Sequence, residues 1–103
     1  MSRDLVPTEG ARFLLERERE QGDGPRATYR TAIYTPDATY EGRAMLADDG
    51  SVELDAGGAP DELASTLQML AKLTARGAAK RRADGLPPWP ARVLRWRGPG
   101  RGE

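Results

Sequence analysis

The chain has 103 residues, enough for one domain, and its 16 basic side chains balance 16 acidic ones. It has no cysteine and no histidine, which excludes disulfides, thiolate zinc sites, cysteine nucleophiles and a histidine general base. Leu, Ile, Val and Phe together number only 16, but the large net charge that accompanies disorder is missing. We therefore expect one folded domain over residues 1–97 with a thin core, and a disordered tail over residues 98–103.

Residues 12–20 are the first predicted element, and their pattern fits either a helix or a strand. Phe13 and the two leucines after it are apolar, and the remainder alternates Glu with Arg. In a helix Glu16 and Glu20 would repel each other, whereas in a strand the glutamates share one face and the arginines the other. We therefore predict a strand.

Three further strands are predicted over residues 26–35, 38–48 and 51–55. β-Branched and aromatic residues, which strands prefer, dominate the first of them, and its alternation places Tyr29, Thr31 and Ile33 on one face. Asp49-Gly50 lies between the last two and predicts a hairpin turn, because both of these turn positions accept positive φ. The four strands together predict an antiparallel meander.

One long helix is predicted to begin at Pro60, because proline is favoured at the first position of a helix. It is expected to end at Asp84-Gly85. An apolar stripe at helical spacing is expected to cover the sheet, and Gly77 continues this stripe, either as a close approach to the sheet or as a weak point of the helix. The stripe consists of Leu63, Leu67, Leu70 and Thr74, flanked by Thr66 and Leu73.

The segment after the helix is rich in Pro, Arg and Trp. Residues 86–90 contain three prolines and are expected to be extended, while residues 91–97 fit a short strand, a helical turn or a docked tail. The predicted fold class is α+β: a four-stranded antiparallel β-meander packed against one long C-terminal α-helix (ββββα), with a Pro/Arg/Trp-rich C-terminal tail. This element order is similar to that of the small single-strand DNA-binding coactivator and whirly-type folds. No family motif accompanies the similarity, so no binding residue is transferred from it.

The neutral net charge conceals an uneven distribution. Residues 1–71 carry seven basic and fourteen acidic side chains, while residues 72–103 carry nine basic and two acidic ones. Such a split is typical either of attraction between two parts of one fold or of a charged partner. We favour attraction within the fold.

The basic third contains the candidate binding residues, because cations interleaved with aromatic rings suit nucleic acid: cations neutralise phosphates, and rings stack on bases. The alternative is that Trp89 and Trp96 fill the thin core while the arginines pair with the acidic part of the sheet. The neutral charge of the whole domain favours this structural interpretation. The candidate nucleic-acid-binding or partner-binding residues are Lys80, Arg81, Arg82, Arg92, Arg95, Trp96 and Arg97.

No catalytic or metal site is predicted. The acidic cluster in the middle of the chain does not match the spacing of a calcium-binding loop, the glycine-rich segments lack a phosphate-binding pattern, and no serine lies in a nucleophile motif. We therefore expect no cofactor and no enzymatic activity, and interpret the cluster as turns, a solvated strand face and a helix cap. Its members are Asp48, Asp49, Glu53, Asp55, Asp61 and Glu62.

These expectations favour a small non-enzymatic interaction module. Its partner would be a second copy of the chain, forming a homodimer that adds burial to the thin core, or another protein. The alternative is a nucleic-acid-binding protein that uses the basic carboxy-terminal third. A membrane partner is not expected, because no stretch approaches the roughly 20 apolar residues of a membrane span. Since residues 1–9 lack the apolar run of a signal peptide, the cytoplasm is the expected location.

Overall fold

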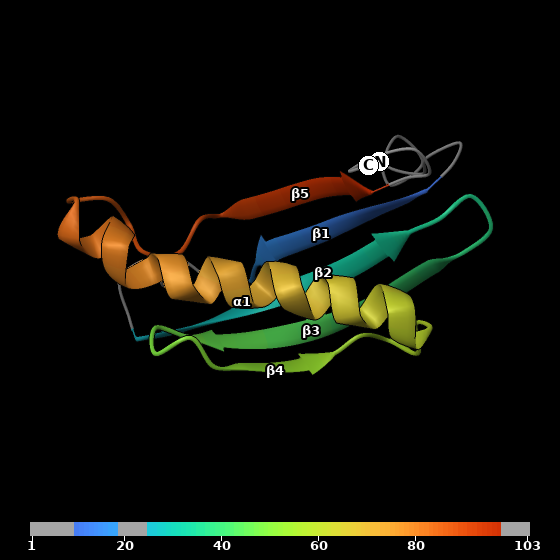
Figure 1. Cartoon of the computed structure of the whole chain (residues 1–103), viewed down its shortest axis with the longest axis horizontal. Coiled ribbons are helices and arrows are strands. Elements are labelled where there is room, and N and C mark those ends of the chain that lie inside the picture. Colours follow the sequence, from blue (N-terminus) through green and yellow to red (C-terminus); the bar gives the residue numbers. More distant parts are fainter. Residues whose placement is uncertain (1–9, 19–24, 98–103) are drawn as a thin grey trace.

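The computed structural model describes residues 10–18 and 25–97. These residues form two layers, a five-stranded antiparallel sheet with one helix lying across one of its faces (Figure 1). The strands lie in the order β4-β3-β2-β1-β5. Along the chain the elements are β1 (Ala11–Arg17), β2 (Arg26–Tyr34), β3 (Thr39–Ala47), β4 (Val52–Asp55), α1 (Asp61–Ala83) and β5 (Arg92–Arg97).

The α+β class, the antiparallel meander from β1 to β4 and the long helix after it are confirmed. The first segment is a strand rather than a helix as far as Arg17. The helix follows Pro60 and ends before Asp84, as the composition of its two ends predicts. The tail expected over residues 98–103 lies outside the described residues.

The prediction of a four-stranded sheet is wrong, because residues 92–97 form a fifth strand beside β1. Strand β1 is apolar on both faces, with Leu15 buried in the main core and Leu14 buried on the opposite side. In the register Val93 lies opposite Leu15 and Leu94 lies opposite Leu14. A strand with apolar residues on both faces gains burial from neighbours along both edges, and β5 provides the second neighbour.

The hairpin predicted at Asp49-Gly50 is confirmed and joins β3 to β4, but its turn is not the two-residue type in which both residues have positive φ. Only Gly50 adopts a positive φ, of 93°. The backbone of Ala47 donates to the carbonyl of Ser51 at 3.0 Å, which closes a three-residue loop. Asp49 stays at negative φ and instead accepts a hydrogen bond from the Ser51 amide at 2.9 Å through its Oδ1 atom.

The main core lies between α1 and the sheet, and the predicted alternation of the strands is confirmed there: Tyr29, Thr31 and Ile33 of β2 are all buried. The predicted helix stripe is wrong in part. Thr74 is half-buried and Leu73 is 56% exposed. Alanines, rather than Leu73 and Thr74, form the contact of the helix with the sheet, and their small side chains let the two approach closely. The buried helix residues are Leu67, Leu70, Ala71, Ala75 and Ala78.

A second, smaller cluster lies on the face of the sheet away from α1. It consists of Leu14, Ala32 and Tyr34, with Leu94 of β5 packed against it. Burial raises the pKa of the Tyr34 hydroxyl, with Glu41 acting in the same direction. No helix in the described part of the chain is both long enough and apolar enough to cross a bilayer.

Candidate functional site: a basic groove beside strand β5

The proline-rich link between α1 and β5 is fixed to the sheet by buried contacts. Trp89 is fully buried in the main core. The Nη1 atom of Arg17 donates to the Trp89 carbonyl at 2.6 Å, and the Tyr29 hydroxyl donates to the Pro90 carbonyl at 2.6 Å. Because these two carbonyls are consecutive, the bonds set the direction in which the chain enters β5.

The Tyr29 hydroxyl keeps its proton well above neutral pH. Burial raises its pKa to about 12, although the positive charges of Arg17 and Arg81 act in the opposite direction. The hydroxyl therefore remains a hydrogen-bond donor to Pro90 at neutral pH.

A groove of about 300 Å³ lies between the second half of α1 and β5. Three arginines line it, and no carboxylate of the described residues does. Its apolar part includes the exposed Leu73 and the half-buried Val93. The full lining is Leu73, Thr74, Gly77, Arg81, Pro90, Arg92, Val93 and Arg95.

The groove follows from the spacing of these residues on their elements. Leu73, Gly77 and Arg81 are four residues apart, so they lie on one face of α1. A Cβ at Gly77 would meet nothing within 4 Å, so this glycine is not the close approach that the sequence allowed. On β5, Val93 and Arg95 share the face that α1 covers, because alternate residues of a strand share a face.

Strand β5 lies at the edge of the sheet. Strand β1 pairs with one of its sides, and among residues 10–18 and 25–97 no strand pairs with the other. The three arginines of β5 form no ion pair with a described carboxylate. Glu16 lies opposite Arg92 in the register, but its carboxylate accepts a hydrogen bond from Arg30 instead. Positive charge therefore gathers along the outer edge of β5, which no described strand pairs with.

The fold separates the basic run at the end of α1 from this groove, except for one residue. Arg81 lines the groove with Arg92 and Arg95. Lys80 lies 3.1 Å from a carboxylate oxygen of Asp84, and Arg82 lies 3.0 Å from a carboxylate oxygen of Asp48. Lys80 and Arg82 therefore each form an ion pair within the fold.

The two tryptophans do not interleave with the arginines in space. Trp89 is buried in the main core, and Trp96 lies half-buried on the opposite face of β5 from Arg95 and Arg97. The alternation of rings and cations in the sequence therefore does not produce one mixed surface.

Sequence reasoning assigned Leu73, Thr74 and Gly77 to the face of the helix that packs on the sheet, and so missed one wall of the groove. Ala71, Ala75 and Ala78 recur at the same helical spacing and are buried. This alanine row is the sequence signal that would have moved the buried face and exposed the groove wall.

Comparison with known proteins gives no match: no family model fits the chain, and neither a curated protein nor a solved structure is significantly similar to it.

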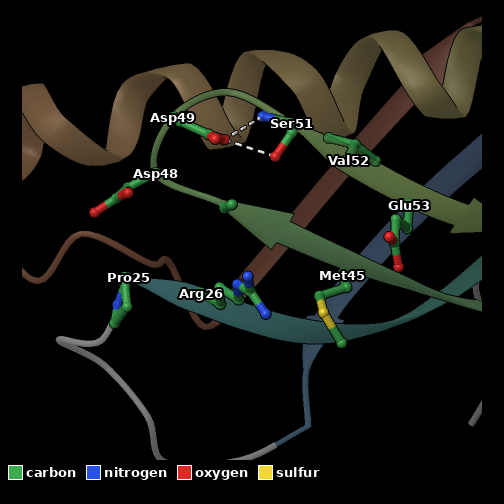
Figure 2. Close-up of a pocket in the computed structure, with 9 residues that line it drawn as sticks. Pro25, Arg26, Met45, Asp48, Asp49, Ser51, Val52 and Glu53 are labelled. Carbon is green, nitrogen blue, oxygen red and sulfur yellow. Dashed lines mark hydrogen bonds between the residues drawn. The ribbon is translucent and has the colours of Figure 1, made fainter.

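A second hollow, of about 620 Å³, lies around the β3–β4 turn, and its charges are mixed (Figure 2). Asp49 bonds both the amide and the hydroxyl of Ser51, and the hydroxyl bond holds its pKa below the usual range. Asp48 points away from Asp49 in Figure 2 and pairs with Arg82. No described group of three carboxylates is placed to hold a metal ion. These acidic residues have structural partners, so the groove beside β5 is the better candidate site.

Proposed function

We propose that the protein is a non-enzymatic interaction module, and that the groove between α1 and β5 together with the outer edge of β5 binds an extended acidic segment of another protein. The observation that carries this proposal is the outer edge of β5, which no described strand pairs with, beside a groove lined by three arginines and no described carboxylate.

An extended segment added to β5 would use both features of the site. Its backbone would pair with the outer edge of β5, which gives affinity without regard to sequence. Its side chains would alternate between the two faces. On the helix side its carboxylates would meet Arg95, and on the opposite face its apolar side chains would lie beside Leu94.

A protein partner suits this site better than nucleic acid does. Binding to a nucleic-acid backbone relies on several cations free to neutralise phosphates, and sequence-independent binding adds exposed rings that stack on bases. Here Lys80 and Arg82 already face carboxylates, and Trp89 is in the core.

Charge also favours a partner other than a second copy. Half of the six residues of β5 are arginines. Two copies joined edge to edge would place the arginines of both along one seam, and like charges on paired strands destabilise the pairing. A homodimer therefore stays a separate prediction, and the molar mass in solution tests it.

Fluorescence anisotropy of a labelled, extended peptide of alternating Val and Glu tests the proposal with the full chain. We expect binding that weakens as salt rises, and Arg95→Glu should reduce the affinity by about tenfold or more. Arg43→Glu is the matched control, because Arg43 is also an exposed strand arginine but faces Glu18 away from the groove. Arg81 is not used, since its Nε donates to the Pro87 carbonyl at 2.8 Å and supports the link.

Equal losses in Arg95→Glu and Arg43→Glu, with both variants folded by circular dichroism, would overturn the proposal. So would tighter binding of a labelled single-stranded oligonucleotide than of the peptide at the same salt concentration. Either result would return the nucleic-acid alternative or general charge attraction to first place.

A further inference from the structure

The outer edge of β5 presents the backbone groups of alternate residues. The Arg17 amide donates to the Ala91 carbonyl at 2.9 Å, so the backbone of Ala91 faces β1. In an antiparallel pair this direction alternates. The backbone groups of Arg92, Leu94 and Trp96 therefore face away from β1, toward the open edge.

Two of these three outward carbonyls are occupied by side chains of the same strand. The Nη1 atom of Arg95 donates to the Leu94 carbonyl at 2.9 Å, and the Nη1 atom of Arg97 donates to the Trp96 carbonyl at 3.2 Å. Both arginines are exposed, and both lie on the face of the sheet that carries α1. Their guanidinium groups thus reach round the edge and cover the acceptors that an added strand would need.

We infer that Arg95 and Arg97 select the partner, and that the segment that binds carries carboxylates at positions i and i+2 on the helix side. This inference rests on the function proposed above. Carboxylates at that spacing share one face of a strand, as the two arginines do. Each carboxylate would accept a bidentate, charge-assisted pair of hydrogen bonds from one guanidinium group, which is stronger than a bond to a neutral carbonyl. The carbonyls of Leu94 and Trp96 would then be free to accept amides of the added strand.

The same contacts would also limit unselective pairing of an edge strand that contains Val93, Leu94 and Trp96. Natural sheets protect exposed edges with charged side chains, and here the protecting side chains also occupy the acceptors. A segment without paired carboxylates leaves both guanidinium groups in place.

Two labelled peptides of identical composition test the inference with the full chain. One alternates Val and Glu, and the other places the same residues as Val-Val and Glu-Glu pairs. Wild-type protein should bind the alternating peptide about tenfold more tightly, because only that peptide matches both arginines. The double variant Arg95→Lys with Arg97→Lys keeps both charges but loses the planar guanidinium, and should lose most of this preference.

Amide hydrogen exchange gives a second readout. The outward amide of Leu94 should exchange about tenfold more slowly with the alternating peptide bound, because it gains a backbone partner. Leu54 on β4, at the opposite edge of the sheet, is the control and should not change. Equal affinity for the two peptides would overturn this inference while leaving the proposed acidic partner standing. Absence of protection at Leu94 would show that the peptide does not pair with β5, and would overturn the proposed strand pairing together with the inference. Failure of both peptides to bind would overturn the proposed function, and the inference with it.

Discussion

Tyr29 is expected to make the folded chain lose stability between pH 10 and pH 12, and a Tyr29→Phe variant is not expected to share that loss. In the unfolded chain the hydroxyl ionises at its ordinary pKa of 10.0, while burial raises the folded pKa to about 12. Between these values the unfolded state has lost a proton that the folded state keeps. The free energy of unfolding therefore falls as the pH rises, and the stabilisation by Tyr29 is fully present only below pH 10.

The size of the effect follows from the two pKa values. Each pH unit between them lowers the free energy of unfolding by about 1.36 kcal/mol, so the full loss is about 2.7 kcal/mol. At neutral pH the phenylalanine variant lacks the 2.6 Å bond to the Pro90 carbonyl and should be less stable by about 1 kcal/mol. The stability curves of the two proteins should therefore cross on the alkaline side.

Urea unfolding followed by tryptophan fluorescence, from neutral pH to strongly alkaline pH, measures both curves. Other groups that titrate at high pH are the same in both proteins, so the difference between the curves isolates Tyr29. Ultraviolet titration of tyrosinate in the folded protein reads the pKa directly. Parallel curves, or a Tyr29 hydroxyl that ionises near pH 10 in the folded chain, would refute the role of burial.

Three other substitutions test the packing that supports the site. Trp89→Ala should cost about 3–5 kcal/mol, because it empties a fully buried site; a loss under 1 kcal/mol in urea unfolding would contradict the anchoring of the link. Gly42→Ala should destabilise the chain by about 1–3 kcal/mol, since its Cβ would overlap the carbonyl oxygen of Asp55 on the neighbouring strand; an unchanged melting temperature would show that β4 yields. Gly77→Ala should raise stability by about 0.8–1.0 kcal/mol, because its Cβ meets nothing within 4 Å and alanine favours helix; destabilisation there would show a contact across the groove.

Local signals were enough to predict the meander and the helix. Alternation in β2 identifies the face that packs against α1, although Ala32 and Tyr34 on the other face are also buried. The residues at each end of α1 complement the helix dipole. These features depend on neighbours a few residues apart, so they can be read from the sequence. The three-residue length of the loop at Asp49 was not predicted. The aspartate side chain accepts a hydrogen bond from Ser51, and the loop needs positive φ only at Gly50.

Strand β5 could not be predicted with the same assurance because it depends on a distant partner. Val93 and Leu94 are adjacent, so the segment shows no period that separates strand from helix. Pairing with β1 decides the matter, since each of these residues meets a buried leucine of β1. The grouping of the arginines was unpredictable for the same reason: their faces are defined only once the register of β5 is known.

The uneven charge of the sequence now has a spatial meaning. If the basic third served only to attract the acidic part, its arginines would face carboxylates of the sheet, as Arg82 faces Asp48. The glutamates of this acidic part instead form ion pairs with arginines of β2 and β3: Glu16 pairs with Arg30, and Glu18 pairs with Arg43. Arg95 and Arg97 of β5 donate to backbone carbonyls, and no arginine of β5 pairs with a described carboxylate. A carboxylate from outside the chain would be a stronger acceptor for them than the carbonyls they now hold, so the positive charge of β5 supports the proposal of an acidic partner.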